Sequence, residues 1–384
     1  MDIKYFDNAA TTKVKYEVLK EMLPFFSEEY GNPSSLYSIG RKSKKVIEEA
    51  RYRTSKLISA NPSEIYFTGC GSESDNAALK GFAYANKNKG NHIITSKIEH
   101  SAILNTCKTL EKQGFNITYL NVNEEGIVNL EELKNSITDK TILISIMFAN
   151  NEIGTIQPIY DIAKIAKERG IVFHTDAVQA VGNIPINVSK MGIDMLSLSG
   201  HKLYGPKGVG ALYVKKGINF DRFIDGGHQE KNKRSGTENV PGIVGLGKAC
   251  ELARINLDYH QKYLKTLRDH YIKKVQSKIP DIKINGSIEN RLPGNSNISF
   301  KGVDAVALLL KLDEKGICAS SGSACSSGDS NPSHVLVSIG LPKDMAQGAL
   351  RVTFGEDNKI EDVDYLVDVL ESAVKELRKL NKKD

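Results

Sequence analysis

One lysine of this chain, Lys202, stands in a setting where its amine could do covalent chemistry. It follows an apolar, strand-like run and opens a glycine-rich turn, within Ser199-Gly-His-Lys-Leu-Tyr-Gly-Pro-Lys-Gly208. A lysine that is desolvated at the mouth of a sheet can lose its proton and attack a carbonyl to form a Schiff base. This chemistry suggests pyridoxal 5'-phosphate (PLP), whereas a solvated surface lysine is the ordinary alternative in a chain with 52 Lys and Arg residues.

PLP also needs a partner for its phosphate, and the segment Thr68-Gly-Cys-Gly-Ser-Glu-Ser-Asp75 offers one. A strand ends there, two glycines permit a close approach, and Ser72 begins an apolar-periodic helix whose free N–H groups suit an anion. Ser72 and Asp75 also have the spacing of an N-capping pair. A plain turn between a strand and a helix is the alternative. Ser199 and His201 flank the lysine and are further candidates to hold the phosphate.

Partners for the pyridine ring follow other predicted strands. His174-Thr-Asp-Ala-Val-Gln179 places Asp176 at the carboxyl end of a strand, where α/β proteins bind ligands. A carboxylate there would keep the ring nitrogen protonated, although capping a turn is a common use of Asp. Gln179 could donate to the ring hydroxyl. His100 is a candidate stacking and acid/base group, with a structural histidine as the alternative, and Asn150-Asn-Glu-Ile-Gly154 brings amides to the same edge.

Cys325 differs from the other four cysteines, because its neighbours in residues 319–331 are mostly Ser, Ala and Gly without apolar periodicity. We expect this segment to be exposed and mobile. A thiol of this kind near a cationic pocket has the profile of a nucleophile, and an ordinary loop cysteine is the alternative. Five cysteines without Cys-x-x-Cys spacing argue against a disulfide framework and a zinc site. They fit a reducing, cytoplasmic compartment.

The elements that position these residues alternate between strand and helix from about residue 60 to residue 215. The predicted strands are Ile65–Thr68, His92–Thr95, Ile117–Val122, Thr141–Phe148, Ile171–His174, Met195–Ser199 and Gly210–Val214. The helical patterns between them include Ser72–Asn86, Ala102–Gln113 and Ile159–Arg169. Buried strands that alternate with helices predict an α/β fold whose large domain holds a mostly parallel, seven-stranded sheet between helices.

A smaller α+β domain is expected toward the C-terminus. A long helix over Leu246–Lys278 leads into it, followed by strands at Ile282–Ile284 and Asn297–Phe300 and helices at Asp304–Lys315 and Glu361–Lys379. We therefore predict a large domain over residues 13–259. Residues 1–12 and 260–384 would form the small domain, which carries the cysteine segment at about residues 319–332.

Composition excludes several other classes of protein. The net charge of +6 is spread along 384 residues, and the longest basic cluster, Lys231–Arg234, contains no aromatic residue. Direct nucleic-acid binding is therefore not expected. No apolar run is long enough to span a bilayer, and the first residues lack the apolar core of a signal peptide, so no membrane association is expected.

Taken together, these motifs resemble those of the NifS/IscS-type cysteine desulfurases, in the class V branch of the fold-type I PLP enzymes. The resemblance covers essentially the whole chain, through Tyr5–Thr12, Tyr30–Ser35, Gly71–Asn76, Glu99-His100, Asn150–Gly154, His174–Gln179, Ser199–Lys202, Arg234–Asn239 and Ser321–Ser326. It departs from the family pattern at Ser72, where Thr is common, at Tyr37, where many relatives have His, and in the loop with His228 and Lys231–Lys233. The last departure concerns the subunit contact.

This resemblance implies a fold-type I PLP-dependent transferase in which Lys202 binds the PLP aldehyde. Asp176 would pair with the ring nitrogen, Gln179 would contact the ring hydroxyl, and His100 would stack on the ring and assist proton transfer. The residues implied to bind the phosphate are Gly71, Ser72, Ser199 and His201, and Thr237 would reach the phosphate of the other subunit of a homodimer.

The implied reaction converts L-cysteine to L-alanine and leaves a persulfide on Cys325. Asn151, which also borders the cofactor, and Arg351 would hold the substrate carboxylate, which a guanidinium can grip with two hydrogen bonds. The sulfur would pass to an Fe–S scaffold or another sulfur-acceptor protein. The one metal role left open is Cys325 as a transient Fe–S ligand.

Three alternatives to the desulfurase remain. A selenocysteine lyase and a class V aminotransferase share the PLP constellation, although a transaminase needs no thiol at position 325. The third alternative is a non-enzymatic sulfur or iron carrier that only presents the thiol.

Overall fold

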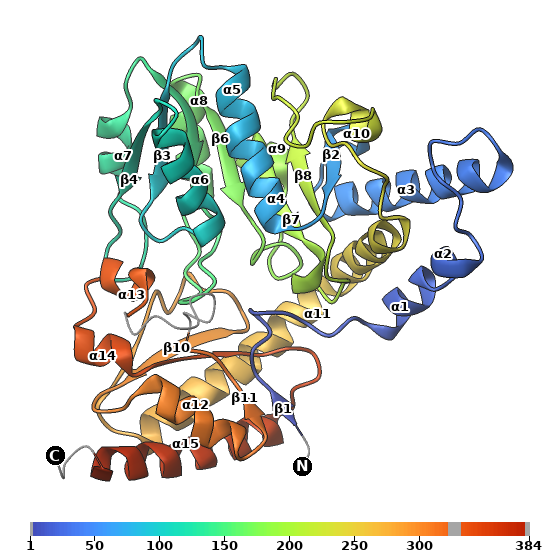
Figure 1. The fold of residues 1–384 in the computed structure, drawn as a ribbon. Helices are drawn as coiled ribbons and strands as arrows, with labels where there is room; N and C mark the ends of the chain where they lie inside the picture. The colour runs from blue at the N-terminus through green and yellow to red at the C-terminus, as the bar shows by residue number, and fades with distance from the viewer. Residues whose placement is uncertain (1–2, 322–331, 381–384) are drawn as a thin grey trace.

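The computed structural model describes residues 3–321 and 332–380, and its largest part is a seven-stranded sheet (Figure 1). The strand order is β2-β8-β7-β6-β5-β3-β4. The strands are β2 (Ile65–Thr68), β3 (His92–Ser96), β4 (Asn116–Leu120), β5 (Thr141–Ser145), β6 (Val172–Asp176), β7 (Met195–Ser199) and β8 (Gly210–Val214). Within this sheet β8 runs antiparallel to both of its neighbours, and all other pairs are parallel. The predicted sheet is confirmed.

The inner strands of the sheet are buried along nearly their whole length because helices cover both faces of the sheet. Ile93 and Ile94 are consecutive in β3, and they belong to two separate apolar clusters on opposite faces. The cluster around Ile93 packs against α5 (Phe82–Ala85) and α6 (Ser101–Glu111). The cluster around Ile94 packs against α3 (Ser38–Leu57), α8 (Ile159–Glu168) and the start of α11 (Val240–Lys278).

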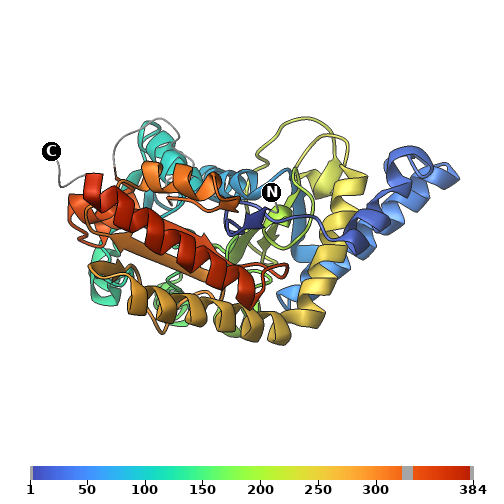
Figure 2. The ribbon, with the colours of Figure 1, turned by 90° about the horizontal axis from the view of Figure 1, so that it is seen from below.

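A second, antiparallel sheet with strand order β12-β10-β9 follows the long helix α11. Its strands are β9 (Ile282–Ile284), β10 (Asn295–Phe300) and β12 (Ala349–Thr353). The helices α12 (Ala305–Asp313) and α15 (Ile360–Leu380) pack on it, and α15 lies beside α11 (Figure 2). Phe6 from the N-terminal segment belongs to the same apolar cluster. The domain boundaries at residues 12 and 260 stay a prediction.

The remaining elements are short. They are β1 (Lys4–Tyr5), which pairs with β11 (Ile317–Cys318), and the helices α4 (Gly71–Asn76), α7 (Leu130–Ser136), α9 (Val188–Met191), α10 (Gln229–Asn232), α13 (His334–Ser338) and α14 (Lys343–Gln347). A π-helical turn over Ala77–Gly81 joins α4 to α5 into one continuous run, and 3-10 turns occur at Pro62–Glu64 and Gly200–Lys202.

Several boundaries differ from the sequence prediction, and the sequence pattern missed some elements. The apolar run after Thr141 continues to Phe148, but β5 ends at Ser145, although the N–H groups of Ile146 and Phe148 still donate to carbonyls of β6. Helix α11 begins at Val240, six residues before the predicted start, because the Asn239 side chain caps it by accepting the N–H of Gly242. Strand β12 lies within a mixed polar and apolar segment that carries no clear period.

The N-terminal helices α1 (Tyr16–Met22) and α2 (Pro24–Ser27) and the start of α3 project from the body of the molecule (Figures 1 and 2). This arm exposes large apolar side chains, namely Tyr16, Leu19, Leu23, Phe26, Tyr30, Leu36 and Tyr37, and Leu36 is 89% exposed. Across residues 3–321 and 332–380, no helix combines the length and the apolar character that a membrane crossing requires.

Candidate active site

A cavity of about 350 Å³ lies at the carboxyl ends of the strands of the large sheet, next to the C-terminal part of the chain. Ten of the predicted site residues line it: Gly71, Ser72, His100, Asn151, Asp176, Gln179, Ser199, His201, Lys202 and Arg351. Thr237 does not line it, because this residue lies on an exposed segment after α10. Cys325 lies outside the described residues. The ten residues come from distant parts of the sequence, and folding brings them to one cavity.

Lys202 ends the 3-10 turn after β7, and the N-terminal segment holds that turn in place. The Lys202 ammonium donates hydrogen bonds to the carbonyls of Ala9 and Ala10, at 2.5 and 2.6 Å. The hydroxyl of Thr12 donates to the His201 carbonyl at 3.0 Å and accepts the N–H of Tyr204 at 2.8 Å. The lysine is therefore positioned by residues 9–12, far from it in the sequence.

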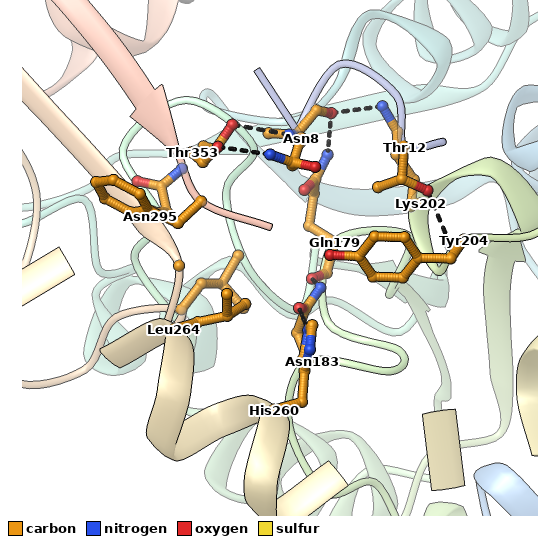
Figure 3. Close-up of a pocket in the computed structure, with 14 residues that line it drawn as sticks. Asn8, Thr12, Gln179, Asn183, Lys202, Tyr204, His260, Leu264, Asn295 and Thr353 are labelled. Atoms are coloured by element: carbon orange, nitrogen blue, oxygen red, sulfur yellow. Dashed lines mark hydrogen bonds between the residues drawn. The ribbon is translucent and has the colours of Figure 1, made fainter. Parts of the chain in front are cut away.

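A second cavity, of about 40 Å³, shares Lys202, Gln179 and Ala9 with the first (Figure 3). The Gln179 amide donates to the Ala9 carbonyl at 3.0 Å, the same carbonyl that the lysine contacts. Asn183 and His260 lie at the far end of this smaller cavity, joined by a hydrogen bond of 3.2 Å. Gln179 and Lys202 therefore approach each other at the boundary of the two cavities.

Two buried carboxyl groups lie opposite His100 in the main cavity. Ligand atoms of Asp75, Asp176 and His100 are all within 4.8 Å of one another. Burial raises the pKa of Asp75 and of Asp176, and the repulsion between the two carboxylates adds to the rise at Asp75. Burial also lowers the pKa of the nearby His174 to about 3, so this ring stays neutral and supplies no counter-charge.

The turn that was predicted to hold a phosphate differs in its capping. Helix α4 begins at Gly71, and its N-cap is Cys70, whose Sγ accepts the N–H of Glu73 at 3.4 Å. The predicted capping pair of Ser72 and Asp75 is wrong, because the helix starts before Ser72 and Asp75 is buried in the cavity. A Cβ added to Gly71 would stand 2.7 Å from Val178 Cγ2, so this position has no room for a side chain.

His100 serves as a structural residue and a site residue together. It is the N-cap of α6, and its Nδ1 accepts the N–H of Ala102 at 3.1 Å. Because Nδ1 acts as the acceptor, the neutral ring carries its proton on Nε2. The structural alternative and the predicted place in the site are therefore compatible.

Arg351, on β12, forms the opposite wall and is 3% exposed. It donates to the carbonyl of Asn151 at 3.1 Å and to a carboxylate oxygen of Asp7 at 2.8 Å. Its Nε has no hydrogen-bond partner among the described residues. Since a guanidinium has five N–H donors, Arg351 can bind a further anion in the cavity.

Sequence reasoning missed two acidic residues of this site. Asp7 forms an ion pair with Arg351, and Asp75 lies beside Asp176. Asp7 occurs in a motif that the family resemblance uses, which was the available signal. Asp75 was interpreted as a cap, because a carboxylate three residues after a serine at a helix start is typical of one.

The described residues fit the three functional groups of PLP. The start of the continuous helical run from Gly71, together with the Ser199 hydroxyl, suits a phosphate, and that hydroxyl is buried without a partner among the described residues. A cationic ring nitrogen beside Asp176 would offset the cost of burying that carboxylate. The Lys202 amine, which lines the same cavity, would suit the aldehyde. The chemistry of the donor set therefore matches this cofactor.

Comparisons with known proteins agree over the length of the chain. Residues 4–366 match the family described as Aminotransferase class-V. The chain is 56% identical to "Cysteine desulfurase IscS" of Clostridium botulinum over 379 residues, which covers 98% of this chain and 96% of that protein. It is 53% identical to a protein of the same name from Methanosarcina thermophila over 377 residues, covering 98% and 93%.

Two solved structures are similar as well. The first, a "NIFS-LIKE PROTEIN", has a TM-score of 0.92 and 39% identity, and the match covers 97% of this chain and 100% of that one. The second, "SspA in complex with cysteine", has a TM-score of 0.82 and 39% identity, with coverage of 91% and 98%.

Proposed function

Because this chain belongs to the cysteine desulfurases of the class V aminotransferase family, we propose that it removes sulfur from L-cysteine, releases L-alanine and holds the sulfur as a persulfide on Cys325. The observation that supports the assignment of residues is the single cavity in which an amine, a buried carboxylate and a buried guanidinium converge. The amine suits the aldehyde of PLP, and the buried carboxylate suits its ring nitrogen. The guanidinium suits the carboxylate of an amino acid.

Each described residue has a role in this proposal. PLP, when bound, supplies an electrophilic aldehyde and an electron-withdrawing ring. Lys202 would hold the aldehyde, and its amine would serve as the base that takes a proton from the substrate Cα. Arg351 and the amide of Asn151 hold the substrate carboxylate, and Asp176 keeps the ring nitrogen protonated. His100 would stack on the ring and exchange a proton through Nε2.

Cys325 carries the sulfur-transfer step of the proposal. Its thiolate attacks the substrate sulfur, so that a sulfur–sulfur bond forms and the carbon–sulfur bond breaks with its electron pair retained by carbon. Protonation of that carbon and return of a proton to Cα, from the Lys202 ammonium, then give alanine. An acceptor thiol on an Fe–S scaffold or a thiolation protein takes the sulfur in turn, and Cys325 is also a candidate for a transient Fe–S ligand. Since the step needs a free thiolate, the proposal places the enzyme in a reducing compartment such as the cytoplasm.

The first prediction tests the nucleophile. We expect Cys325→Ala to keep the visible absorbance of bound PLP and to lose sulfide release from cysteine by at least about a hundredfold, because no other thiol is proposed to accept the sulfur. The measurement is alanine and sulfide formation by purified enzyme with cysteine and a reductant, in which the wild type gives equal amounts.

Lys202→Ala is the matched control for the cofactor. Reduction of the wild type with borohydride, followed by mass spectrometry, is expected to find the coenzyme attached at Lys202. Unchanged sulfide release by Cys325→Ala would reject the nucleophile assignment, whereas a wild type that binds PLP but releases no sulfide from cysteine would favour an aminotransferase or a selenocysteine lyase. No visible absorbance after PLP addition would favour the non-enzymatic carrier.

A homodimer is part of the proposal. The arm formed by α1, α2 and the start of α3 exposes a group of large apolar side chains, which single-chain proteins rarely leave in water. The loop around α10 contacts α4, the helix that is proposed to hold the phosphate, because Arg234 Nε donates to Glu73 of α4 at 2.9 Å. Thr237 follows on this exposed segment, which suits its proposed contact with the phosphate of the other subunit.

A further inference from the structure

The turn after β5 carries a buried carboxylate that the proposed reaction does not use. Glu152 is 5% exposed, and its Oε2 accepts a hydrogen bond from the hydroxyl of Ser333 at 2.6 Å. Ser333 is itself 7% exposed. The main-chain carbonyl of Glu152 accepts the amides of Asn295 and Asn297 on β10, at 3.4 and 3.2 Å. Glu152 therefore joins the large sheet to two separate parts of the C-terminal region.

Ser333 is the N-cap of α13, the first helix that the structure describes after position 325. Its Oγ accepts the N–H of Val335 at 3.1 Å, so one hydroxyl caps the helix and donates to Glu152. The next residue, His334, donates from Nε2 to the carbonyl of Glu99 at 3.0 Å. The start of α13 is thus attached at two points of the large sheet.

The other end of the Cys325 segment is attached close by. Ser320 and Arg351 exchange two main-chain hydrogen bonds, of 2.6 and 3.2 Å. Both ends of the segment are therefore held next to residues of the site, because Glu152 follows Asn151 and Glu99 precedes His100. Residues 322–331 between these ends lie outside the described part of the chain.

We propose that Glu152 is a positioning residue that acts through Ser333 to fix the start of α13 beside the substrate-carboxylate corner, and so sets the rate at which Cys325 takes the sulfur. This inference rests on the proposed function and deepens it. Glu152 touches neither substrate nor cofactor in the proposal, so its effect belongs to the sulfur step and not to the binding of cysteine.

The burial of the Glu152 carboxyl group supports a specific role for its hydrogen bond with Ser333. Burial raises the pKa of Glu152 to about 7, and the hydrogen bond from Ser333 and the charge of Arg351 both oppose the rise. A hydrogen bond to an ionised group is stronger than one between neutral groups, and a small displacement of a reacting group lowers a rate steeply. Keeping a carboxylate here has a desolvation cost, which an apolar side chain of the same size would avoid.

The test separates the sulfur step from substrate binding. PLP-loaded enzyme is mixed with excess cysteine, and the persulfide on Cys325 is followed by quenching and mass spectrometry in a single turnover. We expect Ser333→Ala to lower this rate about tenfold, since a charge-assisted hydrogen bond is lost. The dissociation constant of cysteine, from the absorbance change of the coenzyme, should stay within about twofold. Ser333→Thr, which keeps the hydroxyl, should form the persulfide at about the wild-type rate.

A second set of variants distinguishes the contact with Glu152 from the helix cap. Ser333→Asp keeps a capping oxygen but places a like charge opposite Glu152, so it should be slower than Ser333→Ala. Adding Glu152→Gln to Ser333→Asp should recover part of the rate, because the amide can donate to the new carboxylate. Val337→Ala, on the exposed side of α13, should leave the rate unchanged.

A readout without substrate completes the design. Hydrogen exchange at the amide of Val335 should be faster in Ser333→Ala, which loses the capping oxygen, than in the wild type, also in the enzyme without PLP. Persulfide formation by Ser333→Asp at the wild-type rate would overturn the inference, and so would weaker cysteine binding with an unchanged rate at saturation. If the wild type itself forms no persulfide on Cys325, the proposed function fails instead.

Discussion

At the scale of single residues, burial governs the ionisable groups around the cavity more than ion pairing does. Glu99, which precedes His100, is fully buried, and burial raises its pKa to about 8. The Ser96 hydroxyl at 2.6 Å and the Met147 N–H at 3.0 and 3.1 Å donate to its carboxyl group and oppose the rise. The carboxyl of Glu99 is therefore protonated over part of the neutral range in the folded protein.

This rise gives a prediction for stability. The folded state binds a proton at Glu99 between pH 4.5, the ordinary value, and about pH 8, whereas the unfolded state has lost it there. The free energy of unfolding should therefore fall as the pH rises through this window. We expect Glu99→Gln, which mimics the protonated form, to reduce that fall, as measured by urea unfolding at several pH values. An identical slope in both proteins would contradict it, and Glu124→Gln at an exposed position is the control.

At the scale of elements, the turn that is proposed to hold the phosphate depends on how closely the start of α4 approaches the segment after β6. Gly71 begins the helix, and the side chain of Val178 lies where a Cβ on Gly71 would point. Both residues line the cavity. The absence of a side chain at position 71 therefore allows the start of the helix to pack against Val178 at the edge of the cavity.

The corresponding prediction concerns Gly71→Ala. Because its methyl group would overlap Val178 Cγ2, the start of the helix has to shift, and we expect the dissociation constant of PLP to rise about tenfold. Adding Val178→Ala removes the overlapping methyl group and should restore most of the affinity. Equilibrium dialysis with absorbance detection measures both variants and the single Val178→Ala control. If the double variant binds PLP as poorly as Gly71→Ala, the overlap is not the cause.

At the scale of the whole molecule, two apolar clusters lie on the faces of the large sheet and another fills the C-terminal region, with α11 running between them. The cavity lies where the C-terminal strand β12 and the N-terminal segment meet the carboxyl ends of the large sheet. The arm formed by α1, α2 and the start of α3 exposes large apolar side chains, which contacts within a single chain do not cover.

We predict that this arm lies in the interface of the proposed homodimer. Leu36→Asp and Phe26→Asp introduce charges on side chains that are 89% and 61% exposed, so the fold of the single chain should tolerate them. Light scattering should show a shift from dimer to monomer, and PLP should bind more weakly if Thr237 of one subunit reaches the other. Tyr160→Asp, on the exposed face of α8, is the matched control. Dimers that persist in both arm variants at micromolar concentration would place the interface elsewhere.

The sequence by itself determined the local parts of this site. An apolar strand that is followed by small or polar residues can be recognised in the sequence, because the apolar run and the change in composition at its end are both local. Lys202, Asp176, His100 and Ser72 were all identified from such strand ends. Local patterns also predicted the sheet, since buried parallel strands form nearly continuous apolar runs in the sequence.

Only the tertiary structure decided what these residues meet. Asp7, Asn151 and Arg351 are far apart in the sequence, and their contacts depend on the packing of β12 and the N-terminal segment against the large sheet. Asp75 looked like a helix cap because its local spacing fits one, whereas its burial beside Asp176 depends on the neighbouring strand. Spacing along the chain specifies which side chains can do chemistry, but distances and pKa shifts arise from non-local packing.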